Sequence, residues 1–366
     1  MASIRKISRH SKDGKAAWSW EVRYRDPEGR MRQKTFSTKP EAQRFARTIE
    51  VDKDSGHYVD PRLGKLVFAE WAERWDRANP AKKAATQDTR TRLLQRHILP
   101  TFGSKQLASI KPIDIQEWIT GLEASGLSAS RIRNAFFTLR PCLESAVQSG
   151  FISKSPCISI KLPRPHSRDM QFLTVEQVRA VAEQVPERDR TLVYALAFSG
   201  LRWSEAVALS RKRINLQQGC IEVVEAIVEV NGHHEAGEPK SYEHRTVALP
   251  DFLKQMLVDH LRAYVGLDPN AFVFTTRSGK LLRSRNWRHR VWIPALRAAG
   301  LPESIRIHDL RHSCASLLLA EGATAKAVQE HLGHKSMVTT VDRYAHLMPQ
   351  EPSRIAKALD RSFAGK

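Results

Sequence analysis

The feature that most constrains this chain is a stretch near its middle, SPCISIKLPRPHSRDMQFLT (residues 155–174), which is rich in proline and charge. It has no hydrophobic period, and proline removes backbone donors, so neither a long helix nor a strand is expected there. Such a stretch is typical of an interdomain linker, and we expect it to end near Arg168. The chain is therefore predicted to fold as separate parts, each with its own core.

Residues 1–62 predict a small sheet covered by a helix. In WSWEVRY (18–24) apolar and polar residues alternate with the period of a half-buried strand, and DPEG supplies a turn into a second strand that ends near Phe36. A helix over about residues 40–51 would cover the apolar face. The arginines of the polar face suit either a solvated surface or a sheet that contacts DNA.

Residues 65–157 predict four or five short helices, because apolar residues recur at helical spacing between glycine and proline breaks. Two of these helices carry a basic face away from the apolar stripe. Basic surface residues often only solubilise a protein, but in this chain they are also expected to contact phosphates. The basic residues are Arg90, Arg92, Arg96, Arg131, Arg133 and Arg140.

Residues 168–366 show a mixed pattern of helices, then strands, then helices to the end. The whole chain is therefore predicted to be a multidomain α+β protein, mostly α with small β-sheets. It would comprise an N-terminal sheet-plus-helix domain, a helical domain and a mixed α/β domain.

The charge of the chain indicates a polyanionic partner. Lysine and arginine number 59 against 39 aspartate and glutamate, which gives a net charge of +20. DNA or RNA is the leading candidate. A membrane surface would also attract this charge, but no apolar run approaches a spanning helix and no signal peptide is evident, so we expect a soluble, unsecreted protein. The four scattered cysteines favour a reducing compartment and show no zinc-ligand spacing.

Arg202 is placed at a glycine break between two helices in TLVYALAFSGLRWSEAVALS, with Glu205 three residues later. An arginine there is either paired structurally with Glu205 or oriented by it toward an anion. Farther on, Asn231–Gly232 predicts a β-hairpin. Lys240 follows in a second turn, where a lysine is ordinarily only exposed to solvent. It becomes a candidate proton donor only together with the other candidate site residues described below.

The helix predicted over IRIHDLRHSCASLLLAEG places His308 and Arg311 on one face, beside the apolar arc rather than opposite it. This presents an imidazole and a guanidinium to a cleft. The i, i+4 spacing of His308 and His312 would also suit a zinc site. The metalloprotease pattern, however, needs a glutamate after the first histidine, and here an aspartate follows it and an arginine lies inside the motif. No metal or cofactor is expected.

A further helix ends at Gly333, His334 lies at the following turn, and Tyr344 comes ten residues later. Taken alone, Tyr344 would be interpreted as an ordinary core tyrosine. Two arginines, a lysine, two histidines and a tyrosine in a basic domain nevertheless suit displacement at a phosphodiester. Guanidiniums can hold the phosphate oxygens, a phenol can attack, and Lys or His can protonate the leaving oxygen.

Four segments in this order and spacing closely resemble the sequence boxes of the tyrosine recombinase (phage integrase) family: GLRWSEAVAL, PKSYEHRTVALP, HDLRHSCASLLLAEGA and HLGHKSMVTTVDRYAHL. The resemblance implies that Arg202 and Arg311 clamp the phosphate and that Lys240 is the general acid to the 5′ oxygen. It implies an acid/base role for His308 and a hydrogen bond from His334 to the scissile phosphate. Tyr344 would be the nucleophile that forms a 3′-phosphotyrosyl bond, and Glu205 a supporting residue.

The resemblance also implies a site-specific recombinase that integrates or excises phage or mobile-element DNA in the cytoplasm of a bacterial host, without metal or ATP. Residues 1–62 would bind arm-type DNA sites, residues 65–157 the core site, and residues 168–366 would carry out catalysis. The expected partners are double-stranded attachment sites, three further protomers in a synaptic homotetramer, a host DNA-bending protein and an excisionase. Two alternatives remain open, a type IB topoisomerase and a non-catalytic DNA-binding regulator.

Overall fold

The computed structural model describes residues 2–10, 16–26, 29–54, 63–81, 83–165, 170–230, 232–237 and 244–333, together with Ser336, Tyr344, Asp360 and Phe363. The chain divides into two compact units, residues 1–167 and 168–366. The division falls inside the proline-rich stretch 155–174. The fold is multidomain and mostly helical with small sheets, as predicted.

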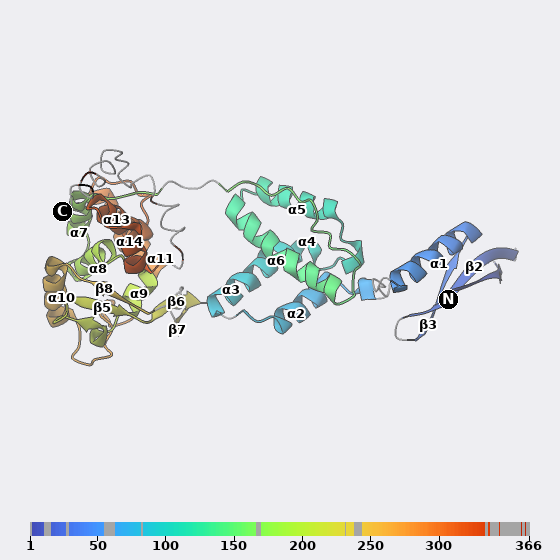
Figure 1. Ribbon diagram of the computed structural model, residues 1–366, viewed down its shortest axis with the longest axis horizontal. Coiled ribbons are helices and arrows are strands. Elements are labelled where there is room, and N and C mark those ends of the chain that lie inside the picture. Colours follow the sequence, from blue (N-terminus) through green and yellow to red (C-terminus); the bar gives the residue numbers. More distant parts are fainter. Residues whose placement is uncertain are drawn as a thin grey trace. The chain divides into compact units, whose positions relative to one another are not determined.

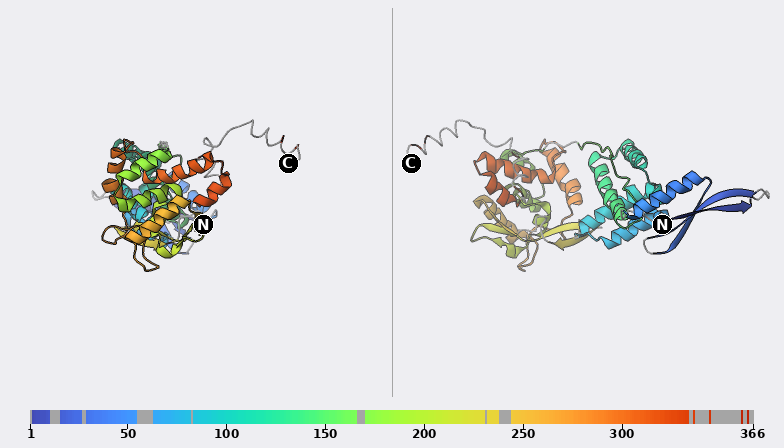
Figure 2. Two further views of the ribbon diagram at one scale, coloured as in Figure 1. Left: turned by 90° about the vertical axis from the view of Figure 1, so that its left-hand side faces the viewer. Right: turned by 45° about the vertical axis from the view of Figure 1, so that its right-hand side comes forward.

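The N-terminal part of the first unit is a three-stranded antiparallel sheet in the order β1-β2-β3, with helix α1 against it (Figure 2). The elements are β1 (Ser3–His10), β2 (Ala16–Arg25), β3 (Met31–Phe36) and α1 (Lys39–Asp54). The sequence analysis found β2, β3 and α1 but not β1. The two isoleucines of SIRKISRH lie at positions of opposite parity, so they do not produce the alternation that marks a half-buried strand.

The core of this sheet is small. Val22 and Tyr24 pack with residues of α1, but Trp18, which the alternation assigned to the same apolar face, is 58% exposed, and Lys6 lies 4.3 Å from the centroid of its ring. On the opposite face Glu21 is buried because Arg5 and Arg23 both pair with it. Part of the basic face is therefore neutralised within the sheet.

The rest of the first unit is a helical module around a core of aromatic and aliphatic side chains, with the bounds α2 (Phe68–Ala78), α3 (Ala84–Leu93), α4 (Leu99–Phe102), α5 (Pro112–Ala124) and α6 (Ala129–Gln148). Short 3-10 turns lie at Leu63–Lys65 and Leu107–Ser109, and one π-helical turn (Leu94–Ile98) joins α3 to α4. The chain therefore passes from α3 to α4 as one continuous helical segment, Ala84–Phe102.

Three of the arginines that were expected to contact phosphates are paired inside this module. Arg90 lies 2.7 Å from Asp76 and stacks on the Trp75 ring, 5.0 Å from its centroid. Arg92 and Arg140 make i, i+4 pairs with carboxylates of their own helices. The Arg90 side chain is only 16% exposed, so its interactions stabilise the module itself.

The second unit combines two small sheets with a shell of helices (Figure 1). Strands β4 (Ile214–Asn215), β5 (Cys220–Val223) and β8 (Arg245–Ala248) form one antiparallel sheet, and β6 (Ala226–Val230) pairs with β7 (His233–Gly237) as a hairpin. Val230 pairs with His233, so the hairpin predicted at Asn231–Gly232 is present, although Asn231 itself lies outside the described residues.

The helices of this unit are α7 (Val175–Gln184), α8 (Glu187–Phe198), α9 (Trp203–Ala208), α10 (Asp251–Tyr264), α11 (Ser284–Trp287), α12 (Ile293–Ala298), α13 (Ile307–Ala320) and α14 (Ala325–Leu332). A 3-10 turn lies at Arg211–Arg213, and a π-helical turn (Arg288–Trp292) joins α11 to α12. Helix α8 packs against α7, α10 and α13, while α14 packs against β8 and α13. This packing brings the C-terminal ends of α8 and α14 together beside the middle of α13.

Candidate active site

The turn between α8 and α9 presents Arg202 and requires a glycine. Gly200 has φ +62°, and a Cβ there would lie 2.6 Å from Cδ2 of Leu332. Arg202 is the N-cap of α9: its backbone N–H donates to Oε2 of Glu205 (2.9 Å), and its guanidinium donates to Oε1 (2.6 Å). The pairing of Arg202 with Glu205, considered from the sequence, is therefore present. A second guanidinium nitrogen of Arg202 donates to the Gly333 carbonyl at 2.9 Å.

A third residue, Arg245, completes this pairing and was missed by the sequence analysis. From the start of β8 it donates to both carboxylate oxygens of Glu205, at 3.0 and 2.7 Å, and to the His331 carbonyl. Burial acts to raise the pKa of the Glu205 carboxyl, but hydrogen bonding and charge from Arg245, with the charge of Arg202, lower that pKa to about 2. Glu205 is therefore a permanent anion in this site.

Arg311 is buried to a degree that helix periodicity did not indicate. It is 2% exposed, and its guanidinium donates to the carbonyls of Gly200 and Leu332. Burial, together with the positive charges of Arg202 and Arg245, lowers the pKa of Arg311 to about 9. This guanidinium is thus held close to two other cations. A bound anion would offset the repulsion between these positive charges.

The three arginines and Glu205, here called the arginine cluster, carry an excess of two positive charges. The four side chains come from α9 and its N-cap, from β8 and from α13. The carbonyls of Gly200, Leu332 and Gly333 accept hydrogen bonds from the guanidiniums of Arg311 and Arg202 and hold them in place. Such preorganised donors are suited to a tetrahedral oxyanion such as a phosphodiester. The cluster brings the predicted Arg202 and Arg311 together.

His308 lies beside this cluster on the exposed side of α13. It lines a cavity of about 310 Å³ together with Arg202, and the β6–β7 hairpin forms part of the wall. His308 and Arg311 therefore flank the same site but differ in exposure, because Arg311 points into the core and His308 toward solvent.

Tyr344 is fully buried, packed with Cys314, Leu332 and Phe172. Its hydroxyl lies 2.7 Å from Nδ1 of His312, a residue that entered the sequence analysis only as a rejected zinc ligand. Leu332 connects this cluster of buried side chains to the arginine cluster, because Leu332 and Tyr344 belong to the same hydrophobic cluster and the Leu332 carbonyl accepts from Arg311. The core packing considered for an isolated tyrosine is thus observed, next to the charged site.

Two predicted site residues, Lys240 and His334, lie outside the described residues. The described chain stops at Gly237, the end of β7, and resumes at His244, directly before Arg245. Before His334 the continuously described chain ends at Gly333, the C-cap of α14, which has φ +65°. The roles of Lys240 and His334 remain predictions from the sequence.

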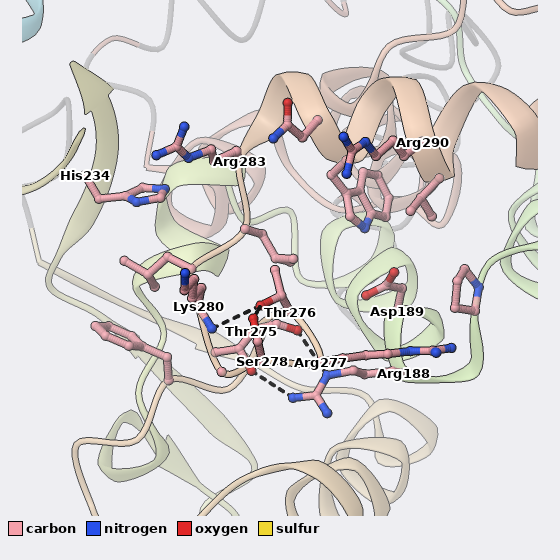
Figure 3. A pocket seen from close by; sticks show the side chains of 18 residues that line it. Arg188, Asp189, His234, Thr275, Thr276, Arg277, Ser278, Lys280, Arg283 and Arg290 are labelled. Atoms are coloured by element: carbon pink, nitrogen blue, oxygen red, sulfur yellow. Dashed lines mark hydrogen bonds between the residues drawn. The ribbon is translucent and has the colours of Figure 1, made fainter. Parts of the chain in front are cut away.

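A second, more basic pocket of about 810 Å³ lies in the same unit (Figure 3). It adjoins the His308 cavity, because His234 and Leu282 line both. In Figure 3 Asp189 lies between Arg290 above and Arg188 below; burial raises the pKa of this carboxyl. The positively charged lining residues are Arg188, Arg277, Lys280, Arg283 and Arg290.

Within the described ranges, no group of three histidine, cysteine, aspartate or glutamate side chains could hold a metal ion. Burial raises the pKa of the Cys314 thiol to about 12, so this cysteine beside the site is a packing residue rather than a thiolate. Every helix of the described chain is too short or too polar to cross a lipid bilayer.

Comparison with known proteins places this geometry in a family. The Phage integrase family model matches residues 171–351, and the model of the phage integrase N-terminal SAM-like domain matches residues 67–122. A phiRv2 prophage integrase of Mycobacterium tuberculosis is 28% identical over 93% of this chain and 92% of its own length. The integrase of Mycobacterium phage D29 is 29% identical over 74% of this chain and 72% of its own length.

Among solved structures, the Tn1549 transposon integrase in complex with a circular intermediate DNA is similar with a TM-score of 0.69 and 20% identity, over 81% of this chain and 99% of that one. A lambda integrase dimer bound to a core site gives a TM-score of 0.59 at 18% identity, over 92% and 93% of the two chains. The family boxes found in the sequence are thus matched by family model and by fold, and this chain belongs to the phage integrase family of tyrosine recombinases, which are site-specific DNA recombinases.

Proposed function

We propose that this recombinase cleaves and rejoins duplex DNA through a 3′-phosphotyrosyl bond formed by Tyr344. The observation that carries the proposal is the arginine cluster, in which Arg202 and Arg245 pair with the carboxylate of Glu205 and Arg311 lies close enough to be affected by their charges. One carboxylate against three guanidiniums leaves two positive charges for an incoming phosphodiester. A buried tyrosine packs against Leu332, whose carbonyl is bonded to the same cluster.

Arg202 and Arg311 hold the non-bridging oxygens of the scissile phosphate, where negative charge grows as the phenol attacks. Arg245 and Glu205 orient them, and do not contact the substrate. His308, on the cavity side, acts in proton transfer. Lys240 protonates the departing 5′ oxygen and His334 donates a hydrogen bond to the phosphate, two roles that rest on the sequence boxes. The phosphotyrosyl ester retains the free energy of the phosphodiester, so rejoining needs neither ATP nor a metal ion.

The large basic pocket supports a DNA backbone path that continues from the scissile phosphate. Among the described residues, Lys280 and Arg290 make no ion pair with a carboxylate, whereas Arg283 pairs with Glu229 and the charge of Arg277 acts on Asp189. Cations without an internal counter-charge are suited to contact phosphates. This pocket adjoins the cavity that Arg202 and His308 line, because His234 and Leu282 line both.

The remaining assignments follow from the family. Residues 1–62 bind arm-type sites, residues 65–157 bind the core site, and residues 168–366 carry out catalysis. A lambda integrase tetramer bound to a Holliday junction is among the solved structures with a similar fold. For this chain we propose the same stoichiometry on two attachment sites, with a host DNA-bending protein and an excisionase as accessory partners. Integration of phage or mobile-element DNA is the corresponding biological role.

The test is a suicide DNA substrate, nicked so that the cleaved strand cannot be rejoined. The wild-type chain and the control Tyr194→Phe should form a covalent complex, and Tyr344→Phe should form none while binding DNA normally. Peptide mapping should place the DNA adduct on Tyr344. An adduct on another tyrosine, or covalent complex in Tyr344→Phe, would refute the proposal.

Two outcomes would instead favour the alternatives. A non-catalytic regulator would yield no covalent complex with any variant, and its DNA binding would be its whole activity. A type IB topoisomerase would relax supercoiled plasmids that lack a paired attachment site. Genomic fragments recovered from the trapped complex identify the attachment sites, since a recombinase should recover one defined sequence rather than arbitrary DNA.

A further inference from the structure

The hydroxyl of Tyr344 is hydrogen-bonded to His312, a residue without a role in the function proposed above. Its oxygen lies 2.7 Å from Nδ1 of His312, and the two ring centroids are 6.0 Å apart. Tyr344 is 0% exposed and His312 is 4% exposed. The contact joins the middle of α13 to a residue 32 positions later in the chain. It is therefore a tertiary contact and not a consequence of local helix geometry.

Burial makes the fate of the phenolic proton a specific problem. A phenol in contact with water can pass its proton to solvent, but burial disfavours the phenolate and keeps bulk hydroxide away. An attacking phenol in such a place therefore needs a base in direct contact. An imidazole suits this task because its ordinary pKa of about 6.5 lies near neutral pH, and a distance of about 2.6–3.2 Å suits proton transfer.

The two histidines of α13 lie on different sides of the site. The His308 ring packs edge-on against the His312 ring with centroids 4.7 Å apart, but His308 is exposed and lines the cavity that contains Arg202. His312 is buried and faces the phenol. Arg311, between them in sequence, donates to the carbonyls that fix the arginine cluster. The phosphate side and the phenol side of the reaction therefore each have an imidazole.

We propose that His312 is the catalytic base that accepts the phenolic proton of Tyr344, a role that rests on Tyr344 being the nucleophile. Neutral His312, protonated at Nε2, receives this proton at Nδ1 while the tyrosyl oxygen bonds to phosphorus. The bond from phosphorus to the 5′ oxygen breaks, and the general acid protonates that oxygen. In rejoining, the deprotonated general acid takes the proton of the 5′ hydroxyl while that oxygen attacks phosphorus. The bond between phosphorus and the tyrosyl oxygen breaks, and His312 returns its proton to that oxygen. The imidazolium formed in between compensates charge that develops at phosphorus.

The first experiment compares His312→Asn with His312→Ala in the full chain, using single-turnover cleavage of the suicide substrate at saturating DNA. Asparagine can hydrogen-bond near the Nδ1 position but cannot take a proton. A base role predicts that both variants cleave about 100- to 10,000-fold more slowly than wild type, with unchanged DNA binding. Wild-type cleavage by either variant, or recovery with asparagine alone, would overturn the proposal by showing that His312 is dispensable or only positions the phenol.

The second experiment changes the acidity of the nucleophile. Incorporating 3,5-difluorotyrosine at position 344 supplies a phenol of lower pKa that depends less on a base. It should raise cleavage by His312→Ala at least about tenfold and leave the Lys240→Ala defect in place. A substrate with a 5′-bridging sulfur, whose leaving group needs no acid, should show the reverse pattern. No gain from the fluorinated phenol in His312→Ala would assign the defect to structure and overturn the proposal.

The two levels of inference fail separately. Covalent complex in Tyr344→Phe would contradict the proposed function, whatever His312 does. Normal cleavage by His312→Ala, with the adduct mapped to Tyr344, would leave the proposed function intact and remove His312 as the base.

Discussion

Among the largely buried arginine–carboxylate pairs of the described residues, two sites differ in charge balance. In the helical module Arg90 faces Asp76 one to one and stacks on Trp75. In the second unit Glu205 receives Arg202 and Arg245, with Arg311 close enough to be affected by their charges. The first arrangement is neutral and needs no ligand, whereas the second holds surplus cations in a buried place. Charge balance therefore separates an arginine that stabilises the fold from arginines that await an anion.

The largest effect should come from removing the shared anion. Glu205→Gln leaves three cations without a carboxylate, and breaking a buried pair in this way costs about 3–5 kcal/mol. Urea unfolding followed by circular dichroism should show this loss, and cleavage should fall because Arg202 loses its orientation. Unchanged stability would mean that the cluster is not electrostatically coupled.

The same residue gives a pH dependence. The pKa of Glu205 is lowered to about 2 from an ordinary value near 4.5, so its stabilisation is fully present above the ordinary value. It should be lost as the pH falls from about 4.5 toward 2, where the unfolded chain binds the proton first. Wild type should lose more stability than Glu205→Gln over this range. Parallel losses in the two proteins would assign the acid sensitivity to other carboxylates.

Arg311→Lys should show the next effect, on the barrier to cleavage. One ammonium cannot reproduce the planar fork that donates to the carbonyls of Gly200 and Leu332. Single-turnover cleavage should fall about 100- to 1,000-fold, while DNA binding measured by gel shift persists because many other phosphate contacts remain. Parallel loss of binding and cleavage would mark Arg311 as structural.

Arg90→Met tests the neutral site. Losing a partly buried pair should destabilise the helical module by about 1–3 kcal/mol. Single-turnover cleavage at saturating DNA should stay close to wild type. A large loss of cleavage with an intact fold would show that Arg90 contacts DNA after all, and the contrast between the two sites would fail.

The smallest expected effect is stabilisation by a simple anion. Sulfate at millimolar concentration should raise the melting temperature of the wild type by an amount equivalent to about 1 kcal/mol or less, relative to sodium chloride of equal ionic strength. Arg245→Met, which removes one surplus charge, should respond less, and Arg90→Met should respond as the wild type does. Equal responses in all three proteins would indicate a general salt effect.

Local patterns in the sequence predicted the parts of the site that depend on neighbours along the chain. Arg202 and Glu205 are three residues apart, and the β6–β7 hairpin follows from an Asn-Gly turn, so both were recognisable. Arg245 was not, because it pairs with Glu205 from 40 residues away. The bond between His312 and Tyr344 was missed for the same reason. The family boxes give residue types and their order along the chain, but the distances that assign partners arise only on folding.

Burial was the least predictable quantity. Helix periodicity placed Arg311 at the edge of the apolar arc, and it is instead enclosed, because the carbonyls of Gly200 and Leu332 receive its donors. In the N-terminal sheet the alternation predicted a buried Trp18 and an exposed Glu21, and the structure has the reverse. Glu21 is covered by Arg5 and Arg23, and Trp18 lies beyond the small core of the sheet.

Gly200 and Gly333 limit how this enzyme can be re-engineered by exchanging segments between relatives. Both have positive φ, and a Cβ at Gly333 would lie 2.8 Å from the side chain of Arg245. A Cβ at Gly200 would collide with Leu332, which belongs to the helix that Gly333 ends. A chimera whose junction falls between residues 200 and 333 therefore takes these two glycines, and the surfaces packed against them, from different parents. Such a junction is tolerated only where each parent has glycine at the position that it contributes.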